Sequence, residues 1–149
     1  MHNLVISVLL AVLLLASIAV LPVRAQDKPA TAVGGKLEVE LNTTNQLSDA
    51  CRIALVVKNG MRQSIESLVI ELVLFGKDGK VLRLLSASVG AMPVSKTRLK
   101  QYDVQDVKCE SIGRVLLNGL TSCEGENLTA KICTAATRTS SRTTTPLDY

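Results

Sequence analysis

Apolar and polar residues alternate with a period of two in successive short segments of this chain, and this pattern limits its fold most strongly. In "KLEVEL" (residues 36–41), Leu37, Val39 and Leu41 share one face of an extended chain. The next two segments repeat the spacing, and their expected core faces are Cys51, Ile53, Leu55 and Val57 in "CRIALVVKN" and Leu68, Ile70, Leu72 and Leu74 in "IESLVIELVLF". Half-buried strands are therefore expected.

Turn signals separate these segments and complete the prediction. "GKDGK" (residues 76–80) is typical of a hairpin, because Asp-Gly tolerates a positive φ. The charged segment "KTRLKQYDV" suits an edge strand, and residues 110–118 fit either a strand or a helix, with Gly113 favouring a strand. The Thr-rich end suits a final edge strand or a frayed tail. The pattern predicts an all-β, antiparallel, Ig-like or fibronectin-like sandwich of six or seven strands, although the chain has no tryptophan.

The first 25 residues have the pattern of a signal peptide. An apolar run from Leu4 to Pro22 is followed by Val23 and Ala25, at the −3 and −1 positions of a cleavage site before Gln26. No Arg-Arg pair precedes the run, so a Sec-type signal and a periplasmic location are expected. The alternative is a retained leader that anchors the protein in the membrane, since roughly 18 apolar residues just span a bilayer.

Removal of residues 1–25 leaves 124 of the 149 residues, which is enough for one domain. We expect a flexible lead-in at 26–35, a sandwich domain at 36–140 and a C-terminal tail at 141–149. The leader removes one of the 17 basic residues and no acid, so the mature charge is 16 minus 13, or +3. This weak, interspersed charge argues against nucleic acid, and no second long apolar segment predicts a membrane span.

The histidine content argues against common enzyme chemistry. His2 is the only histidine and departs with the leader, so the mature chain has no imidazole for a catalytic pair or a metal site. Ser95 beside Lys96 is only an adjacency, and Asp103, Asp106 and Glu110 lack the spacing of a known calcium loop. We therefore expect no enzyme activity, no catalytic residue, no metal and no cofactor.

The four cysteines are expected to form two structural disulfides. They are Cys51, Cys109, Cys123 and Cys133, with gaps that contain no Cys-x-x-Cys motif. If the strands alternate in direction, Cys51 and Cys109 lie at the same end of the sandwich, and Cys123 and Cys133 remain for a local loop. The alternative is a thiol-redox protein or other periplasmic enzyme that uses Cys123 or Cys133.

Five basic residues interrupt otherwise regular strands and are the candidate partner-binding residues: Arg52, Arg83, Arg98, Lys100 and Arg114. A charge that faces inward must be paired or lie at the sheet margin, because an unpaired buried charge is costly. Together with the other observations, they predict a non-catalytic accessory module. It would bind another envelope protein through a sheet face or edge, with strand addition as one mode.

The segments "ACRIALVVKN", "LVLFGKDGKV" and "DVKCESIGRVLLN" resemble a family of small exported alphaproteobacterial proteins often called Tat pathway signal sequence domain proteins. The most specific element is Cys109 followed by "IGRVLLN" (residues 112–118), and the resemblance covers about residues 36–133. It implies a bacterial periplasmic setting, and it implies no activity that could be transferred to this chain.

Overall fold

A computed structural model describes residues 34–149 of the chain. The predicted signal peptide, its cleavage site and most of the lead-in lie outside the described residues. Eight strands and one short α-helix follow: β1 (Leu37–Gln46), β2 (Ala50–Asn59), β3 (Ser67–Gly76), β4 (Val81–Ser88), β5 (Thr97–Gln105), β6 (Ile112–Glu124), α1 (Ala130–Ala136), β7 (Thr137–Ser141) and β8 (Leu147–Asp148). No helix in this part of the chain has both the length and the apolar character needed to cross a membrane.

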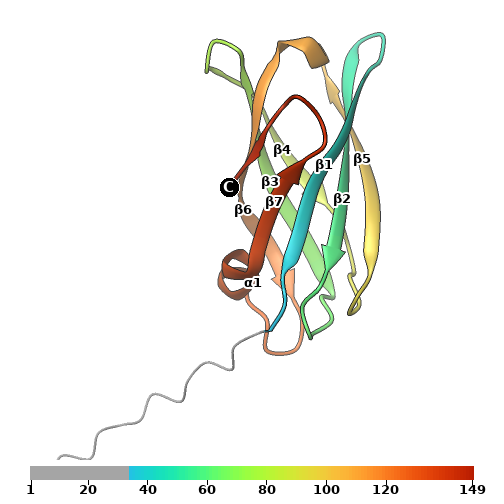
Figure 1. Cartoon of the computed structure of the whole chain (residues 1–149), viewed down its shortest axis with the longest axis vertical. Coiled ribbons are helices and arrows are strands. Elements are labelled where there is room, and N and C mark those ends of the chain that lie inside the picture. Colours follow the sequence, from blue (N-terminus) through green and yellow to red (C-terminus); the bar gives the residue numbers. More distant parts are fainter. Residues whose placement is uncertain (1–33) are drawn as a thin grey trace, which may run out of the picture. The chain divides into compact units, whose positions relative to one another are not determined.

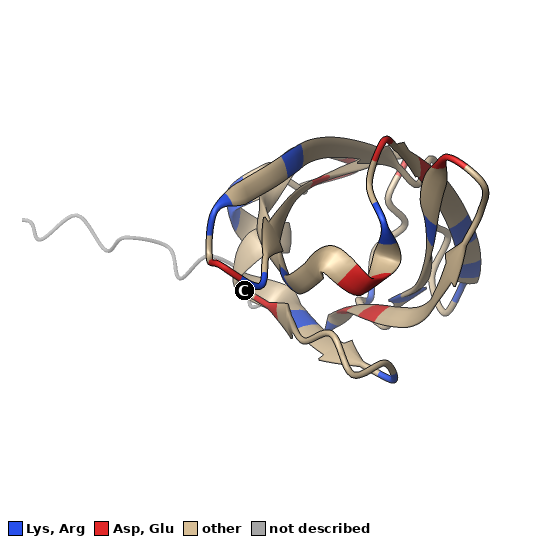
Figure 2. Cartoon of the chain, turned by 90° about the horizontal axis from the view of Figure 1, so that it is seen from above, with Lys and Arg blue, Asp and Glu red and all other residues tan. Residues whose placement is uncertain are grey.

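The strands form two four-stranded sheets (Figure 1). The first sheet has the order β5-β2-β1-β7, and the second has the order β4-β3-β6-β8. Seen from above, the strands surround a common interior (Figure 2). The predicted two-sheet, all-β architecture is therefore confirmed, and β4 and β5 are edge strands.

The core lies between the two sheets, and the predicted inward faces are confirmed. The apolar residues assigned to the core in β1, β2 and β3 are all fully buried: Leu37, Val39, Leu41, Cys51, Ile53, Leu55, Val57, Leu68, Ile70, Leu72 and Leu74. From β6, Val115 and Leu117 join them. Alternation at a period of two is sufficient to place these residues, because only one face of each strand meets the core.

The sheets are mixed, and the expectation of a purely antiparallel sandwich is wrong. β7 runs parallel to β1, with Leu37 opposite Thr137, and β8 runs parallel to β6, with Val115 opposite Leu147. The reason is the connection after β6. There α1 carries the chain to the first sheet, so β7 starts beside the start of β1 and runs in the same direction (Figure 1).

The ambiguous segment 110–118 is a strand along most of its length. A short 3₁₀ helix at Cys109–Ser111 precedes it, and β6 begins at Ile112. The C-terminal residues are also structured. Thr137–Ser141 is the edge strand that the Thr-rich pattern allowed, and Leu147, in the segment expected as a tail, is buried in β8.

Both predicted disulfides are present, with the predicted pairing. Cys51 bonds Cys109 over a sequence separation of 58, and Cys123 bonds Cys133 over a separation of 10. The first joins the start of β2 to the turn before β6, and the second joins the end of β6 to α1. These bridges therefore hold opposite ends of the sandwich.

Candidate binding surface

The structure divides the five candidate basic residues into two groups. Arg52 lies on the outer face of β2, where its Nε and Nη2 donate to the two Asp103 carboxylate oxygens at 2.6 and 2.8 Å. These hydrogen bonds hold the pKa of Asp103 below its usual value. Arg114 lies on the outer face of β6, with its guanidinium 3.8 Å from the centre of the Phe75 ring and 3.5 Å from Asp148. Both cations are satisfied within the domain.

The other three basic residues lie where the edges of β4 and β5 face each other. We call this side the seam and define it by Arg83, Arg98, Lys100 and Tyr102. Arg83 is opposite the core residue Leu74 in the β3–β4 register, so it faces inward at the margin of its sheet. In β5, Arg98, Lys100 and Tyr102 are likewise opposite inward residues of β2, namely Val57, Leu55 and Ile53.

Side chains alone bridge the seam, because β4 and β5 belong to different sheets. The Arg83 Nη2 donates to the Gln105 carbonyl at 3.0 Å, and the Tyr102 hydroxyl donates to the Ser88 carbonyl at 2.9 Å. Arg98 donates to a loop carbonyl at 2.8 Å. Among the described residues, no carboxylate forms an ion pair with Arg83, Arg98 or Lys100. Their charges are therefore available to a ligand.

The β4 edge also has unpaired backbone groups. In an antiparallel strand, the N–H and C=O of one residue point to the same side and those of the next residue to the other side. The Val89 N–H bonds the Leu68 carbonyl of β3, so the odd-numbered residues of this strand point toward β3. Leu84 and Ser86 must then point their backbone groups toward the free edge.

An exposed apolar surface covers the outer face of the second sheet next to this edge. Val81 is 61% exposed and Leu84 is 58% exposed. Leu84 is opposite Val73, which is opposite Leu116, and Val81 is opposite Phe75. We call this surface the apolar band and define it by Phe75, Val81, Leu82, Leu84 and Leu116, which lie around the buried Val73.

A small groove joins the seam to the apolar band. Its volume is about 210 Å³, and it lies between β4 and β5. It is lined by Arg83, Asp103 and Gln105 together with Leu84, Leu85 and Val104. Because Asp103 is paired with Arg52, the groove offers the Arg83 cation beside apolar contact within one narrow site.

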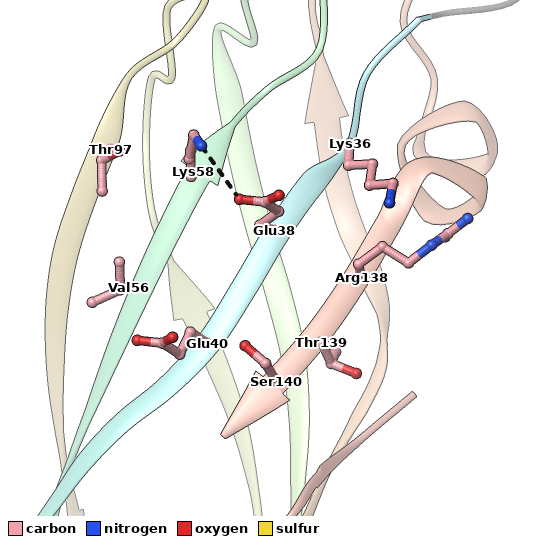
Figure 3. Close-up of a pocket in the computed structure, with 9 residues that line it drawn as sticks. All are labelled: Lys36, Glu38, Glu40, Val56, Lys58, Thr97, Arg138, Thr139 and Ser140. Atoms are coloured by element: carbon pink, nitrogen blue, oxygen red, sulfur yellow. Dashed lines mark ion pairs between the residues drawn. The ribbon is translucent and has the colours of Figure 1, made fainter. Parts of the chain in front are cut away.

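A second hollow lies on the outer face of the first sheet. It has a volume of about 290 Å³ and is lined by β1, β2, β7 and the start of β5 (Figure 3). Its acids are already paired: Glu38 lies 3.7 Å from Lys58, and Glu40 lies 3.0 Å from Arg142. A hydrogen bond from the Asn42 amide, with further help from Arg142, lowers the pKa of Glu40. The hollow therefore has no unpaired acid, whereas its Lys36 and Arg138 form no ion pair among the described residues.

The residues considered for catalysis or metal binding are not brought together. No cluster of three or more His, Cys, Asp or Glu side chains suited to a metal occurs among residues 34–149, and Asp103 is bonded to Arg52 instead. All four cysteines of the chain are in disulfides, and Cys123 and Cys133 are buried. The redox alternative would require this second bridge to be broken.

The apolar band is the feature that sequence reasoning missed. Its signal is present in "VLRLL" (residues 81–85), where apolar residues occupy both faces of a strand. The same pattern occurs in core strands and in edge strands with an exposed apolar face, so the pattern alone does not show which face reaches solvent. Phe75, the only phenylalanine, also lies on the outer face.

Tyr102 provides a spectroscopic prediction at the seam. Burial raises its pKa above the ordinary value of 10, because the neutral phenol is favoured away from water. The associated stabilisation is fully present below pH 10 and is lost as the pH rises through the pKa of the folded state. In the Tyr149→Phe variant, Tyr102 is the only tyrosine, and its tyrosinate absorbance is expected to appear at a higher pH than in the same variant unfolded in urea. Coincident titrations would contradict its burial.

No protein-family model, curated protein or solved structure matches the chain, so its function is inferred from the geometry of the seam and the apolar band.

Proposed function

We propose that this chain is a non-catalytic interaction module of the bacterial periplasm. It binds another envelope protein along the seam and the apolar band. The observation that carries the proposal is the apolar band, in which Val81, Leu82 and Leu84 of β4 are exposed. Contiguous exposed apolar surface on a soluble domain marks interaction sites, whereas single exposed apolar residues do not.

Two observations support the setting that the proposal requires. The two intramolecular disulfides are consistent with an oxidising, exported compartment. The signal-peptide pattern in residues 1–25 and the resemblance to exported alphaproteobacterial proteins point to the same location. An Ig-like relationship belongs to the proposal too, and the two facing sheets support it.

Site-specific photo-crosslinking in the native envelope tests the proposal. A photoreactive residue at Ser86, on the free edge of β4, is expected to capture one envelope protein. The matched position is Ser140, which is also an exposed serine on an edge strand, in the first sheet. It is expected to capture none. The double variant V81S/L84S should reduce the Ser86 adduct at least tenfold, because each buried apolar side chain contributes roughly 1.5–3 kcal/mol and about 1.4 kcal/mol is already a factor of ten.

Four outcomes would overturn the proposal. Equal adducts from Ser86 and Ser140, or no adduct from Ser86, would remove the interface. An adduct of twice the mass of this chain would show that the surface binds a second copy. Substrate turnover that is lost when a seam residue is replaced would contradict the non-catalytic part.

A further inference from the structure

We infer that the occupant of the seam is an extended segment of the partner that pairs with β4 as an added strand and alternates acidic with apolar residues. This inference rests on the proposed function and specifies the chemistry of its partner. Backbone pairing, inward charge and outward apolar contact each contribute one independent requirement.

The backbone requirement follows from the β4 edge. The N–H and C=O groups of Leu84 and Ser86 point away from β3, and among the described residues the one hydrogen bond to the backbone of this edge is donated by the Tyr102 hydroxyl to the Ser88 carbonyl. Exposed edges of this kind pair readily with an extended peptide. An added strand would supply hydrogen-bond partners for the free backbone groups of Leu84 and Ser86.

The charge requirement follows from the inward side of the seam. An added strand would place alternate side chains on this side, next to Arg83 and toward the cations of β5. Arg98 and Lys100 are partly exposed and, within the described chain, have no carboxylate partner. Apolar residues at these positions would leave three cations without counter-charges, whereas glutamate or aspartate would pair with them.

The apolar requirement follows from the outward side. The row Leu84–Val73–Leu116 crosses three strands and stops at the free edge of β4, where Leu84 is more than half exposed. The outward side chains of an added strand would extend this row by one position. Cross-strand apolar pairs are a main source of sheet stability, so valine or isoleucine is expected there.

Short peptides test these requirements on the purified protein with both disulfides formed. The probe is a ten-residue peptide in which glutamate alternates with valine. Three control peptides each change one requirement: lysine replaces glutamate, serine replaces valine, or every second backbone nitrogen of the glutamate-valine probe is methylated. Only the unmodified glutamate-valine peptide is expected to bind measurably by fluorescence anisotropy, and added salt should weaken its binding.

Protein variants locate the site. The R83Q/K100Q variant is expected to lower the affinity for the glutamate-valine peptide about tenfold, because two exposed ion pairs are lost. R52Q is the matched control, since Arg52 is paired with Asp103 on the outer face, and its affinity should be unchanged. S86P removes one free-edge N–H and leaves the β3 ladder intact, so it should abolish binding without lowering Tm.

Each failure has a distinct meaning. Equal binding of the lysine and glutamate peptides would overturn the acidic assignment, and equal binding of the methylated peptide would overturn strand addition. If no peptide binds, or R52Q weakens binding as much as R83Q/K100Q, the inference is wrong as a whole. In all these cases, a Ser86-specific crosslink to an envelope protein would still support the proposed function, which fails only on its own test.

Discussion

Replacement of Cys51 and Cys109 by alanine is expected to lower the free energy of unfolding by about 4 kcal/mol. Replacement of Cys123 and Cys133 is expected to lower it by about 3 kcal/mol. The difference follows from loop-closure entropy, since the first bridge closes a sequence separation of 58 and the second closes a separation of 10. Urea denaturation of the two double variants under non-reducing conditions measures both values.

The fully reduced protein is the control for this experiment. Its free energy of unfolding should fall by at least the loss expected for C51A/C109A alone, because both bridges are open. A domain of this size has about 5–15 kcal/mol of stability, so the C51A/C109A variant is expected to be marginally folded. A larger loss for C123A/C133A than for C51A/C109A would contradict the entropic explanation and point to packing around α1.

The cysteine pairing was predictable because it depends only on the direction of successive strands. Chain direction reverses at each connection from β2 to β6, so Cys51 and Cys109, which precede strands of the same direction, had to lie at one end of the sandwich. The parallel positions of β7 and β8 were not predictable in this way. They depend on α1, a seven-residue helix whose Thr129 cap accepts a hydrogen bond from the Ile132 N–H, within a segment expected only as a loop.

The candidate site was predictable only in part, since a sequence shows which residues are charged and not which charges are paired. All five basic residues interrupt strands in the same way. Arg52 has its acid on a neighbouring strand at Asp103, and Arg114 has Asp148, which is 34 residues away in sequence. Lys100 has no such partner among the described residues. Whether a basic residue has an acidic partner depends on which residue lies opposite it on the neighbouring strand. Apolar alternation within a strand does not specify this register.

Asn59 is a buried polar residue that sequence reasoning did not single out. It ends β2 and is fully buried. Its Nδ2 donates to the Gln63 carbonyl at 2.9 Å and to the Met92 carbonyl at 2.7 Å, and its Oδ1 accepts from the Met61 N–H at 3.0 Å. One side chain thus joins the loop after β2 to the loop after β4. Buried loop backbone needs such partners, because water does not reach it.

Replacement of Asn59 by alanine is therefore expected to lower the free energy of unfolding by about 2–4 kcal/mol, since the Gln63 carbonyl and the Met61 N–H lose their partners and the Met92 carbonyl keeps only the Ile65 N–H. The matched control is Asn45→Ala, because the Asn45 amide makes only an exposed side-chain contact. It should change stability by less than about 0.5 kcal/mol. Urea denaturation measures both, and similar small losses would show that water enters and satisfies the site.

The same variant links stability to the seam. The Met92 carbonyl that Asn59 holds follows Ala91 in the chain, and Arg98 donates to the Ala91 carbonyl at 2.8 Å. Loss of the Asn59 amide leaves Met92 held only by its two backbone hydrogen bonds with Ile65, so the loop that Arg98 contacts should loosen before the core unfolds. We expect amide hydrogen exchange in residues 89–96 of the alanine variant to be faster than in β1, which shares neither contact. Equal acceleration in both segments would instead indicate uniform destabilisation of the domain.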